Sequence, residues 1–448
     1  MNKFKILGVA ISVAGTILFQ RCKLEKVVVP PLAITILTPS AAHAGDTVSI
    51  IGKNFISGRR DRYKISIGGV PIDTNYITEI KEDVINFRVP VGIGSGKVTI
   101  TSDLIPGLIA TSIDSFTYYY TATKVETFAG TYGLRGCEGK APNCLNYPMG
   151  IALDENKQYL IVADNGNNLI HKIPLNKNDQ EKILGVYPSN PACSFTKESK
   201  DESMNVYFKS PYDVEVDSNG DIYVAEDENH TIRVLRKGNG GSGEGRADII
   251  AGDCSNPGYD PGQNCLRARS LTNPVSLFKD NKNLYFSDNG IIRVLELNDV
   301  GNCNSISNIS GNNISSQYFT VLEVSHANNQ GPIFIGDRLE RKIKAMSIDG
   351  KTSDVVTLPS GIFQSIALTI DEYGNIFIAA NNTIYVYYYA TRELITLAGT
   401  GDKGYTPDSN APLSAKFNNP LGLALFEKAG VLFVADTDNN VIRKVTFQ

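Results

Sequence analysis

One motif recurs six times between residues 146 and 445 of this 448-residue chain. Each copy is centred on an apolar strand that ends in a small residue, and an acidic residue follows it in five of the copies. The six small residues are Ala163, Ala225, Ser287, Gly336, Ala379 and Ala435. Further apolar segments precede and follow each strand, so every copy supplies three to four strands. Repeats of this kind with irregular spacing indicate sheets arranged radially around an axis.

The first and the sixth copies carry the most complete form of the motif. The first reads Pro148-x-Gly150-Ile151-Ala152-x-Asp154, and the sixth contains Val434-Ala435-Asp436-x-x-Asn439-x-x-Ile442-Arg443. This pattern resembles the NHL family of β-propellers. The resemblance implies that residues 121–448 form an NHL-type six-bladed β-propeller.

The two ends of this repeat region are predicted to pair. The chain stops at Gln448, directly after the third strand of the sixth copy, so that copy lacks an outer strand of its own. The segment Val125–Gly130 precedes the first copy in the same way that Leu394–Gly399 precedes the sixth. We therefore predict that residues 124–130 supply the missing strand, which leaves no open sheet edge in the ring.

Residues 32–120 are predicted to form a separate small β-sandwich. Six or seven short runs alternate β-branched and polar residues and are bounded by Pro and Gly. The order of Pro39, Gly45, Val48-x-Ile50-x-Gly52-x-x-Phe55, Gly68-Gly69-Val70, Pro90, Gly96 and Phe116-x-Tyr118 is similar to that of the IPT/TIG family of immunoglobulin-like domains. The resemblance implies a spacer that holds a binding domain off a surface. The predicted fold class is all-β, with an N-terminal immunoglobulin-like β-sandwich followed by a six-bladed β-propeller.

Three tyrosines, Tyr118, Tyr119 and Tyr120, end the sandwich segment. We expect this terminal strand to pack on the next domain. An exposed platform for a ligand is the alternative.

The N-terminal residues 1–22 have the pattern of a signal peptide with a candidate lipidation site. Lys3 and Lys5 precede an apolar run of about 14 residues, shorter than the ~20 that a transmembrane helix needs. Cys22, followed by a linker at 23–31, resembles the bacterial lipoprotein pattern, in which the Cys is acylated. An uncleaved anchor or a buried Cys22 is the alternative. The expected localisation is the bacterial cell envelope, as an outer-membrane or cell-surface lipoprotein, with the periplasm as the alternative.

The acids that follow the central strands are candidate site residues. They are Asp164, Glu226, Asp288, Asp337 and Asp436. We interpret them as hydrogen-bond acceptors in the tight turns between the second and third strands, because Asp commonly stabilises turns in this way. A ring of carboxylates around Ca²⁺ or another divalent ion is the alternative. We expect no metal and no cofactor.

Six further cysteines lie in the insertions between copies. Similar placement after an Ala-Gly strand end predicts local disulfides from Cys137 to Cys144 and from Cys254 to Cys265. Cys193 and Cys303 remain as a third, weaker pair. Stiffened surface loops of this kind commonly bind partners.

Charge and motifs narrow the class of function. The net charge is −4 and the Lys and Arg residues are scattered, so nucleic acid is not an expected partner. Nucleophile elbows, HExxH and phosphate loops are absent, so no catalytic residue is assigned. The sequence favours a cell-envelope lipoprotein whose NHL-like propeller binds a protein or carbohydrate at a loop face. The alternative is a propeller hydrolase, lactonase or lyase with a carboxylate-bound metal in its central channel.

Overall fold

The structure is a computed structural model that describes the chain from residue 30 to residue 448 with internal gaps. The residues outside the description are 1–29, 59, 104–107, 135–143, 177–178, 180, 186–205, 238–246, 254–270, 281, 299–300, 310–320, 325–331, 348 and 360–365. Within the described part, no helix has the length and apolar character needed to cross a membrane. The helices there are single 3₁₀ turns, so the described fold is all-β.

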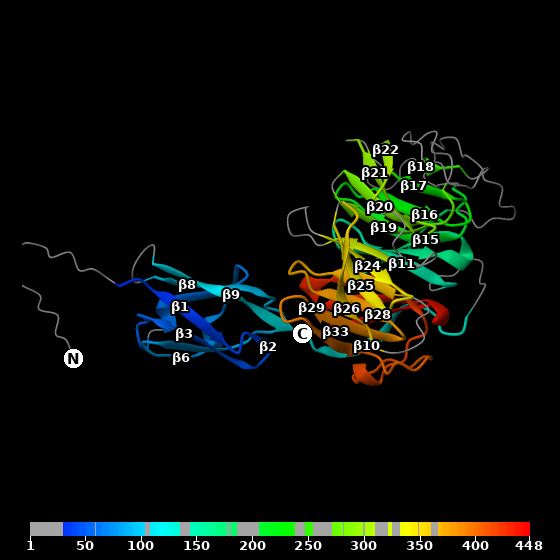
Figure 1. Ribbon diagram of the computed structural model, residues 1–448. Coiled ribbons are helices and arrows are strands. Elements are labelled where there is room, and N and C mark those ends of the chain that lie inside the picture. Colours follow the sequence, from blue (N-terminus) through cyan, green and yellow to red (C-terminus); the bar gives the residue numbers. More distant parts are fainter. Residues whose placement is uncertain are drawn as a thin grey trace, which may run out of the picture.

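The N-terminal domain is a sandwich of two sheets (Figure 1). One sheet contains β1 (Ala33–Thr38), β3 (Thr47–Lys53), β7 (Val84–Arg88) and β6 (Ile77–Ile80). The other contains β2 (Ala41–His43), β9 (Ile109–Tyr119), β8 (Gly96–Ser102), β4 (Tyr63–Ile67) and β5 (Val70–Ile72). The described strands number nine, more than the six or seven expected, because β2 and β5 are only three residues long. Val48, Ile65 and Phe87 are fully buried between the sheets.

The described part of the C-terminal region contains six four-stranded sheets, which we call blades. Blade 1 contains β11 (Pro148–Leu153), β12 (Tyr159–Asp164), β13 (Leu169–Pro174) and β14 (Lys182–Leu184). Blade 2 contains β15 (Pro211–Val216), β16 (Ile222–Glu226), β17 (Thr231–Leu235) and β18 (Ala247–Gly252). Blade 3 contains β19 (Pro274–Asp280), β20 (Asn283–Asp288), β21 (Ile291–Leu297) and β22 (Cys303–Asn308).

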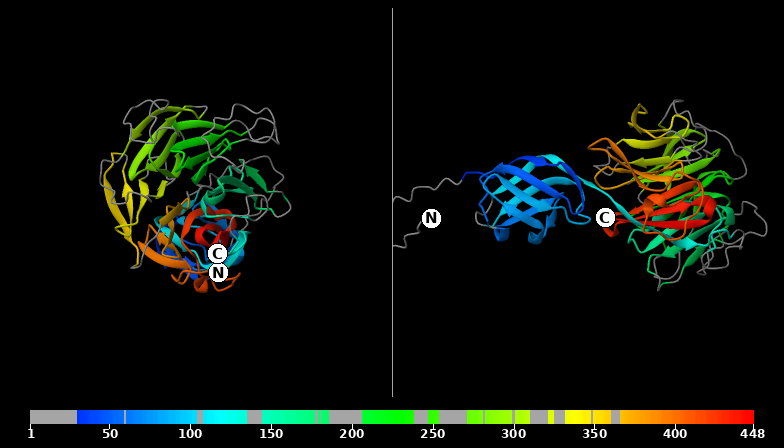
Figure 2. Two further views of the ribbon diagram at one scale, coloured as in Figure 1. Left: turned by 90° about the vertical axis from the view of Figure 1, so that its right-hand side faces the viewer. Right: turned by 90° about the horizontal axis from the view of Figure 1, so that it is seen from below.

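The other three blades follow the same order. Blade 4 contains β23 (Val321–Val324), β24 (Ile333–Asp337), β25 (Lys342–Met346) and β26 (Thr352–Thr357). Blade 5 contains β27 (Ile366–Ile370), β28 (Ile376–Ala380), β29 (Thr383–Tyr388) and β30 (Glu393–Ala398). Blade 6 contains β31 (Pro420–Phe426), β32 (Val431–Asp436), β33 (Val441–Phe447) and the strand β10 (Ala122–Gly130) from the start of the region. Each inner strand contacts the inner strand of the next blade, and β31 contacts β11, so the blades form a ring around a central channel (Figure 2).

The predicted pairing of the two ends of the repeat region is confirmed. β10 runs antiparallel to β33, with Val125 opposite Val445 and Gly130 opposite Val441. Both valines of the first pair are fully buried. The ring is therefore closed by hydrogen bonds between segments from opposite ends of the repeat region.

The middle strands of the blades are buried on both faces because each blade packs against two neighbours. Every residue of β16, β28 and β32 is buried. These strands therefore read as continuous apolar runs rather than as an alternation of apolar and polar residues. Their burial explains why the repeat was visible in the sequence.

The two faces of the ring carry different structures. The inner strands start at one face of the ring, which we call the loop face because the described connection from blade 5 to blade 6, residues 399–419, enters there. The inner strands end at the opposite face, which we call the sandwich face. Tyr120, at the end of the sandwich, bonds to Asp371 and Glu427, which directly follow the inner strands β27 and β31. The sandwich is accordingly seen behind the ring in the left view of Figure 2.

Candidate functional site

The five acids of the repeat motif are buried at the loop face, where the second strands end. Each has an exposed fraction of at most 2%. The N–H of Asn146 donates to Asp164 Oδ1 at 2.7 Å, and that of Asn418 donates to Asp436 Oδ1 at 2.7 Å. Side-chain amides of the following turns also donate to these acids, as from Asn439 Nδ2 to Asp436 Oδ2 at 2.8 Å. The acids thus accept hydrogen bonds in the turns, and all of them except Asp337 are seen to bond the entry of the inner strand as well.

Four of the five acids pair with a basic side chain from the third strand of the same blade. His171 Nε2 lies 2.8 Å from Asp164 Oδ2, and Lys344 Nζ lies 2.9 Å from Asp337 Oδ2. Arg293 Nη1 donates to Asp288 at 2.8 Å, and Arg233 Nε donates to Glu226. Each pair is internal to its blade. The described residues contain no cluster of three or more His, Cys, Asp or Glu residues with the geometry of a metal site.

Blade 6 departs from this pairing. Its basic residue, Arg443, lies over the ring of Tyr405 at 4.8 Å and donates to the carbonyl oxygen of Thr406 at 3.0 Å. Burial raises the pKa of Asp436 to about 7, although hydrogen bonds from Asn439 and Asn418 act in the opposite direction.

Most of the candidate cysteines fall outside the described residues. They are Cys22, Cys137, Cys193, Cys254 and Cys265. Cys144 is buried just before β11 at the loop face, and Cys303 begins β22. The disulfide pairing and the lipidation of Cys22 therefore stay predictions.

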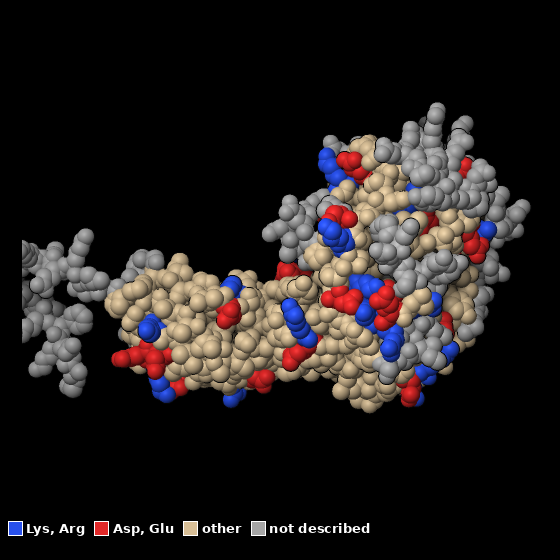
Figure 3. All heavy atoms as spheres, in the orientation of Figure 1, with Lys and Arg blue, Asp and Glu red and all other residues tan. Residues whose placement is uncertain are grey.

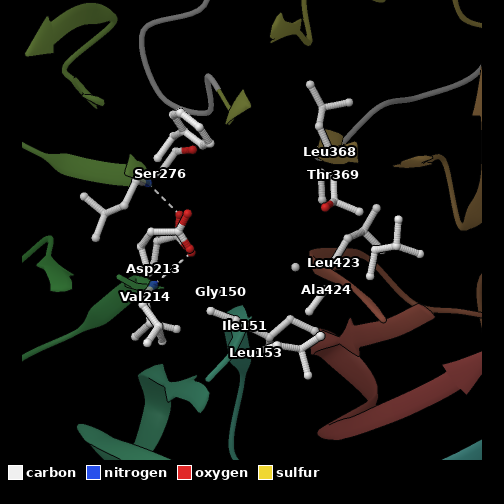
Figure 4. Close-up of a pocket in the computed structure, with 18 of the residues that line it drawn as sticks. Gly150, Ile151, Leu153, Asp213, Val214, Ser276, Leu368, Thr369, Leu423 and Ala424 are labelled. Carbon is white, nitrogen blue, oxygen red and sulfur yellow. Dashed lines mark hydrogen bonds between the residues drawn. The ribbon is translucent and has the colours of Figure 1, made fainter. Parts of the chain in front are cut away.

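The described part of the propeller contains a cavity in its central channel. The cavity there has a volume of about 280 Å³ and follows the inner strands of blades 1, 2, 3, 5 and 6. Figure 4 shows Gly150, Thr369 and Ala424 around the opening, with Asp213 on the blade 2 side. Most of the exposed lining of this cavity is polar. Small-molecule sites typically place a few convergent polar groups in the wall of such a cavity, at volumes upward of about 300 Å³.

Two carboxyl groups from β15, Asp213 and Glu215, line the channel. They are two residues apart on one strand, so their side chains project from the same side of it. The N–H of Leu277 in blade 3 donates to Asp213 Oδ2 at 2.6 Å, and the N–H of Val214 donates to Oδ1 at 2.9 Å (Figure 4). The N–H of Lys279 donates to Glu215 Oε1 at 3.5 Å. The pair therefore bridges the inner strands of blades 2 and 3.

The environment of this pair favours the protonated form of both groups. Burial raises the pKa of Asp213 to about 7, although its two backbone hydrogen bonds act against the change. Burial, and then the charge of Asp213, raises the pKa of Glu215 to about 8. Strongly shifted carboxyl groups in a cavity are typical of functional sites.

Sequence reasoning missed these two residues, although the repeat contained a signal. Asp213 occupies the position of Gly150 in blade 1, and Glu215 occupies the position of Ala152. Gly150 makes room for the acid, because a Cβ there would lie 1.9 Å from Asp213 Oδ1. Acidic residues at positions where the motif has small residues were thus the sequence signal for this pair.

The charges of the visible surface are mixed. In Figure 3, Lys and Arg side chains lie beside Asp and Glu side chains on both domains, and no extended blue area covers the face shown. This distribution differs from the clustered positive surface that nucleic-acid binding needs.

Comparison with protein families agrees with this architecture. The family model described as "IPT/TIG domain" matches residues 32–118, and the one described as "NHL repeat" matches residues 208–235. The chain contains an IPT/TIG domain and an NHL repeat. The matched NHL segment covers β15, β16 and β17, and therefore includes the channel acids Asp213 and Glu215. The TIG domain corresponds to the sandwich, and the NHL repeat lies in the propeller.

Two named proteins resemble part of this chain in sequence. "NHL repeat-containing protein 2" of Homo sapiens is 24% identical over 350 residues, which cover 67% of this chain and 47% of that protein. "Protein SUPPRESSOR OF QUENCHING 1, chloroplastic" of Arabidopsis thaliana is 25% identical over 312 residues, covering 67% of this chain and 25% of that protein. The chain thus spans less than half the length of either relative.

Solved structures share the whole two-domain fold. A protein of unknown function from Bacteroides thetaiotaomicron has a TM-score of 0.59 at 16% identity, with 94% of this chain and 98% of that chain covered. An auxiliary nutrient binding protein from the same species has a TM-score of 0.51 at 14% identity, with 93% and 98% covered. At these identities the similarity shows the fold alone.

Proposed function

We propose that this chain is a cell-envelope binding protein whose NHL-type propeller takes up a small carbohydrate in its central channel. The observation that carries this proposal is the pair Asp213 and Glu215 in the wall of the central channel. With pKa values of about 7 and about 8, both carboxyl groups are largely protonated below neutral pH. A protonated carboxyl both donates and accepts hydrogen bonds, which matches the hydroxyl groups of a sugar.

The rest of the channel wall supplies further contacts. The small residues Gly150 and Ala424 and the hydroxyl-bearing Thr369 line the cavity around the pair (Figure 4). Small side chains leave room for a sugar ring, and the Thr369 hydroxyl and the two carboxyl groups would hydrogen-bond its hydroxyl groups. The cavity of about 280 Å³ suits a small ligand rather than a protein segment. The auxiliary nutrient binding protein with the same two-domain fold is in keeping with this class of function.

The proposed location follows from Cys22 and from the placement of the domains. A lipid on Cys22 would hold the chain at the membrane, with the sandwich between the anchor and the propeller. The described chain begins at the end of the sandwich distant from the propeller (Figure 1), and the loop face points away from the sandwich. The loop-face end of the channel would then point away from the membrane.

Calorimetric titration of the full chain in detergent with a panel of mono- and oligosaccharides tests the proposal. We expect saturable binding that weakens at least about tenfold in the Asp213→Asn/Glu215→Gln variant, a loss of about 1.4 kcal/mol that matches one hydrogen bond. Glu228→Gln is the matched control, because the Glu228 side chain is 59% exposed on the same blade.

Two results would count against this proposal. Failure of every sugar in the panel to bind would contradict the ligand class, and binding of a protein partner at the loop face would then take its place. Wild-type affinity in the double variant, with an unchanged circular dichroism spectrum, would remove the two acids from the site. Release of a reaction product during titration would show instead that the pair acts on its ligand as acid and base.

A further inference from the structure

The sandwich and the propeller meet in a compact polar cluster that we call the joint. It consists of Tyr119 and Tyr120 from the sandwich end, and Asp371, Tyr388 and Glu427 from the propeller. Tyr120 is 5% exposed, and its ring contacts those of Phe377 and Phe447. The expectation that the terminal tyrosines pack on the next domain is therefore confirmed for Tyr120. Its backbone N–H also donates to Tyr388 Oη at 2.6 Å.

The hydroxyl of Tyr120 lies between two carboxyl groups. It is 2.9 Å from Asp371 Oδ2 and 3.2 Å from Glu427 Oε1. Asp371 also accepts from the N–H of Tyr373 at 2.9 Å and from Asn375 N and Nδ2 at 2.8 and 2.7 Å. Burial raises the pKa of Asp371, but four donors converge on this carboxylate and act in the opposite direction by stabilising its ionised form.

The single hydrogen of the Tyr120 hydroxyl limits how the two carboxyl groups can both bond to it. A tyrosine hydroxyl carries one hydrogen and can donate only one hydrogen bond. We assign that hydrogen bond to Asp371, the nearer of the two carboxyl groups, so a hydrogen bond between the Tyr120 oxygen and Glu427 requires a proton on Glu427 Oε1. The other oxygen, Oε2, faces the N–H of Glu372 at 3.4 Å and is the acceptor of that weak contact.

We propose that the proton on Glu427 locks the joint, and that its loss lets the sandwich change its angle to the propeller. Without the proton, Tyr120 loses a donor and a second negative charge faces Asp371 across one hydroxyl. Like charges at this distance in a partly buried site repel each other. The inference is independent of the ligand in the channel.

The other charged and titratable groups around the joint do not neutralise this pair. On the propeller side, Glu372 adds a further negative charge and the exposed Lys428 follows Glu427 in the chain. Tyr373, Tyr388 and Tyr118 carry no charge at physiological pH, and burial raises the pKa of each further. On the far side of Tyr119, its hydroxyl donates to Glu393, and His43 Nδ1 lies 2.9 Å from Thr121 Oγ1.

The titration range of Glu427 supports the geometry. Burial, followed by the charge of Asp371, raises its pKa to about 7. The lock would therefore open between mildly acidic and mildly alkaline pH.

Distance measurement between the domains tests the proposal. Nitroxide labels on non-natural ketone residues at Lys53 and Lys351, both exposed, would report the angle in the full chain in detergent. We expect a narrow distance distribution at about pH 5.5 and one at least about twice as broad at about pH 8.5. Glu427→Gln should stay narrow at both values, because its amide keeps a donor without a charge. Tyr120→Phe should be broad at both.

Two results of the distance measurement would contradict the role of Glu427. A distribution in the wild type that does not change with pH would overturn the proposal. So would a transition that persists in Glu427→Gln, because another group such as His43 would then be responsible. Glu228→Gln, on the surface of blade 2, is the control and should behave as the wild type. Circular dichroism at both pH values confirms that each variant is folded.

Discussion

The buried pair of His171 and Asp164 predicts that the chain becomes easier to unfold as the pH rises above neutral. His171 lies in β13 of blade 1, and its side chain is 1% exposed. Its Nε2 lies 2.8 Å from Asp164 Oδ2, and its Nδ1 lies 2.6 Å from Glu181 Oε1. With a carboxylate at each nitrogen, both ring nitrogens are donors, so the imidazole is positively charged.

The magnitude follows from the shift in pKa. Burial by itself lowers the pKa of His171, but the hydrogen bonds to Asp164 and Glu181 outweigh it and raise the value from 6.5 to about 9. A difference of this size between folded and unfolded chains corresponds to about 3 kcal/mol. Because the folded pKa is the higher one, the full contribution is present below about pH 6.5. It is lost as the pH rises through about 9.

Urea unfolding between about pH 6 and about pH 10, followed by far-ultraviolet circular dichroism, measures this effect; the chain has no Trp for fluorescence. The informative quantity is the difference in free energy of unfolding between the wild type and His171→Gln, because other titrating groups cancel. We expect this difference to shrink by about 3 kcal/mol across the range. His230→Asn is the control, since the His230 ring bonds the carbonyl oxygen of Thr272 and no carboxylate.

A difference that stays constant with pH would refute the reasoning. It would show that His171 is neutral in the folded chain and that the repeat does not require a cation at this position. A pH dependence lost equally in His230→Asn would show that the effect is not specific to the buried pair.

Two further predictions concern ring closure and the anchor. Val125→Lys places a charge at a fully buried position opposite Val445, so it should destabilise the propeller by at least about 3 kcal/mol. Thermal unfolding measures this loss. Lys124→Gln, at the half-exposed neighbouring position, is the control and should change the stability little. An unchanged midpoint in Val125→Lys would contradict closure through β10. Cys22→Ser should move the protein from the membrane fraction to the soluble fraction of its native host, and unchanged fractionation would contradict lipidation.

The repeat and the ring closure could be predicted because both depend on local patterns. Middle strands such as β32 are buried on both faces and therefore stand out as apolar runs ending in a small residue and an acid. The pairing of β10 with β33 followed from one missing strand and one matching segment. Asp213 and Glu215 were within reach of the same comparison, because they replace the small residues found at Gly150 and Ala152.

The joint was beyond sequence reasoning because it depends on distance in space. Tyr120 is 251 residues from Asp371 and 307 residues from Glu427 along the chain. No periodicity links these positions, and each acid follows an inner strand in the same way as the turn acid Asp154. Only the docking of the sandwich on blades 5 and 6 makes them share one hydroxyl.

The sequence by itself determined which segments become strands and how the ends of the repeat region meet, because burial and turn chemistry act over a few residues. The tertiary structure alone decided which polar groups lose their water and which of them become neighbours. That distinction has a physical cause: the pKa and pairing of Asp213, Glu215 and Glu427 depend on the desolvation and charges that surrounding blades and domains impose.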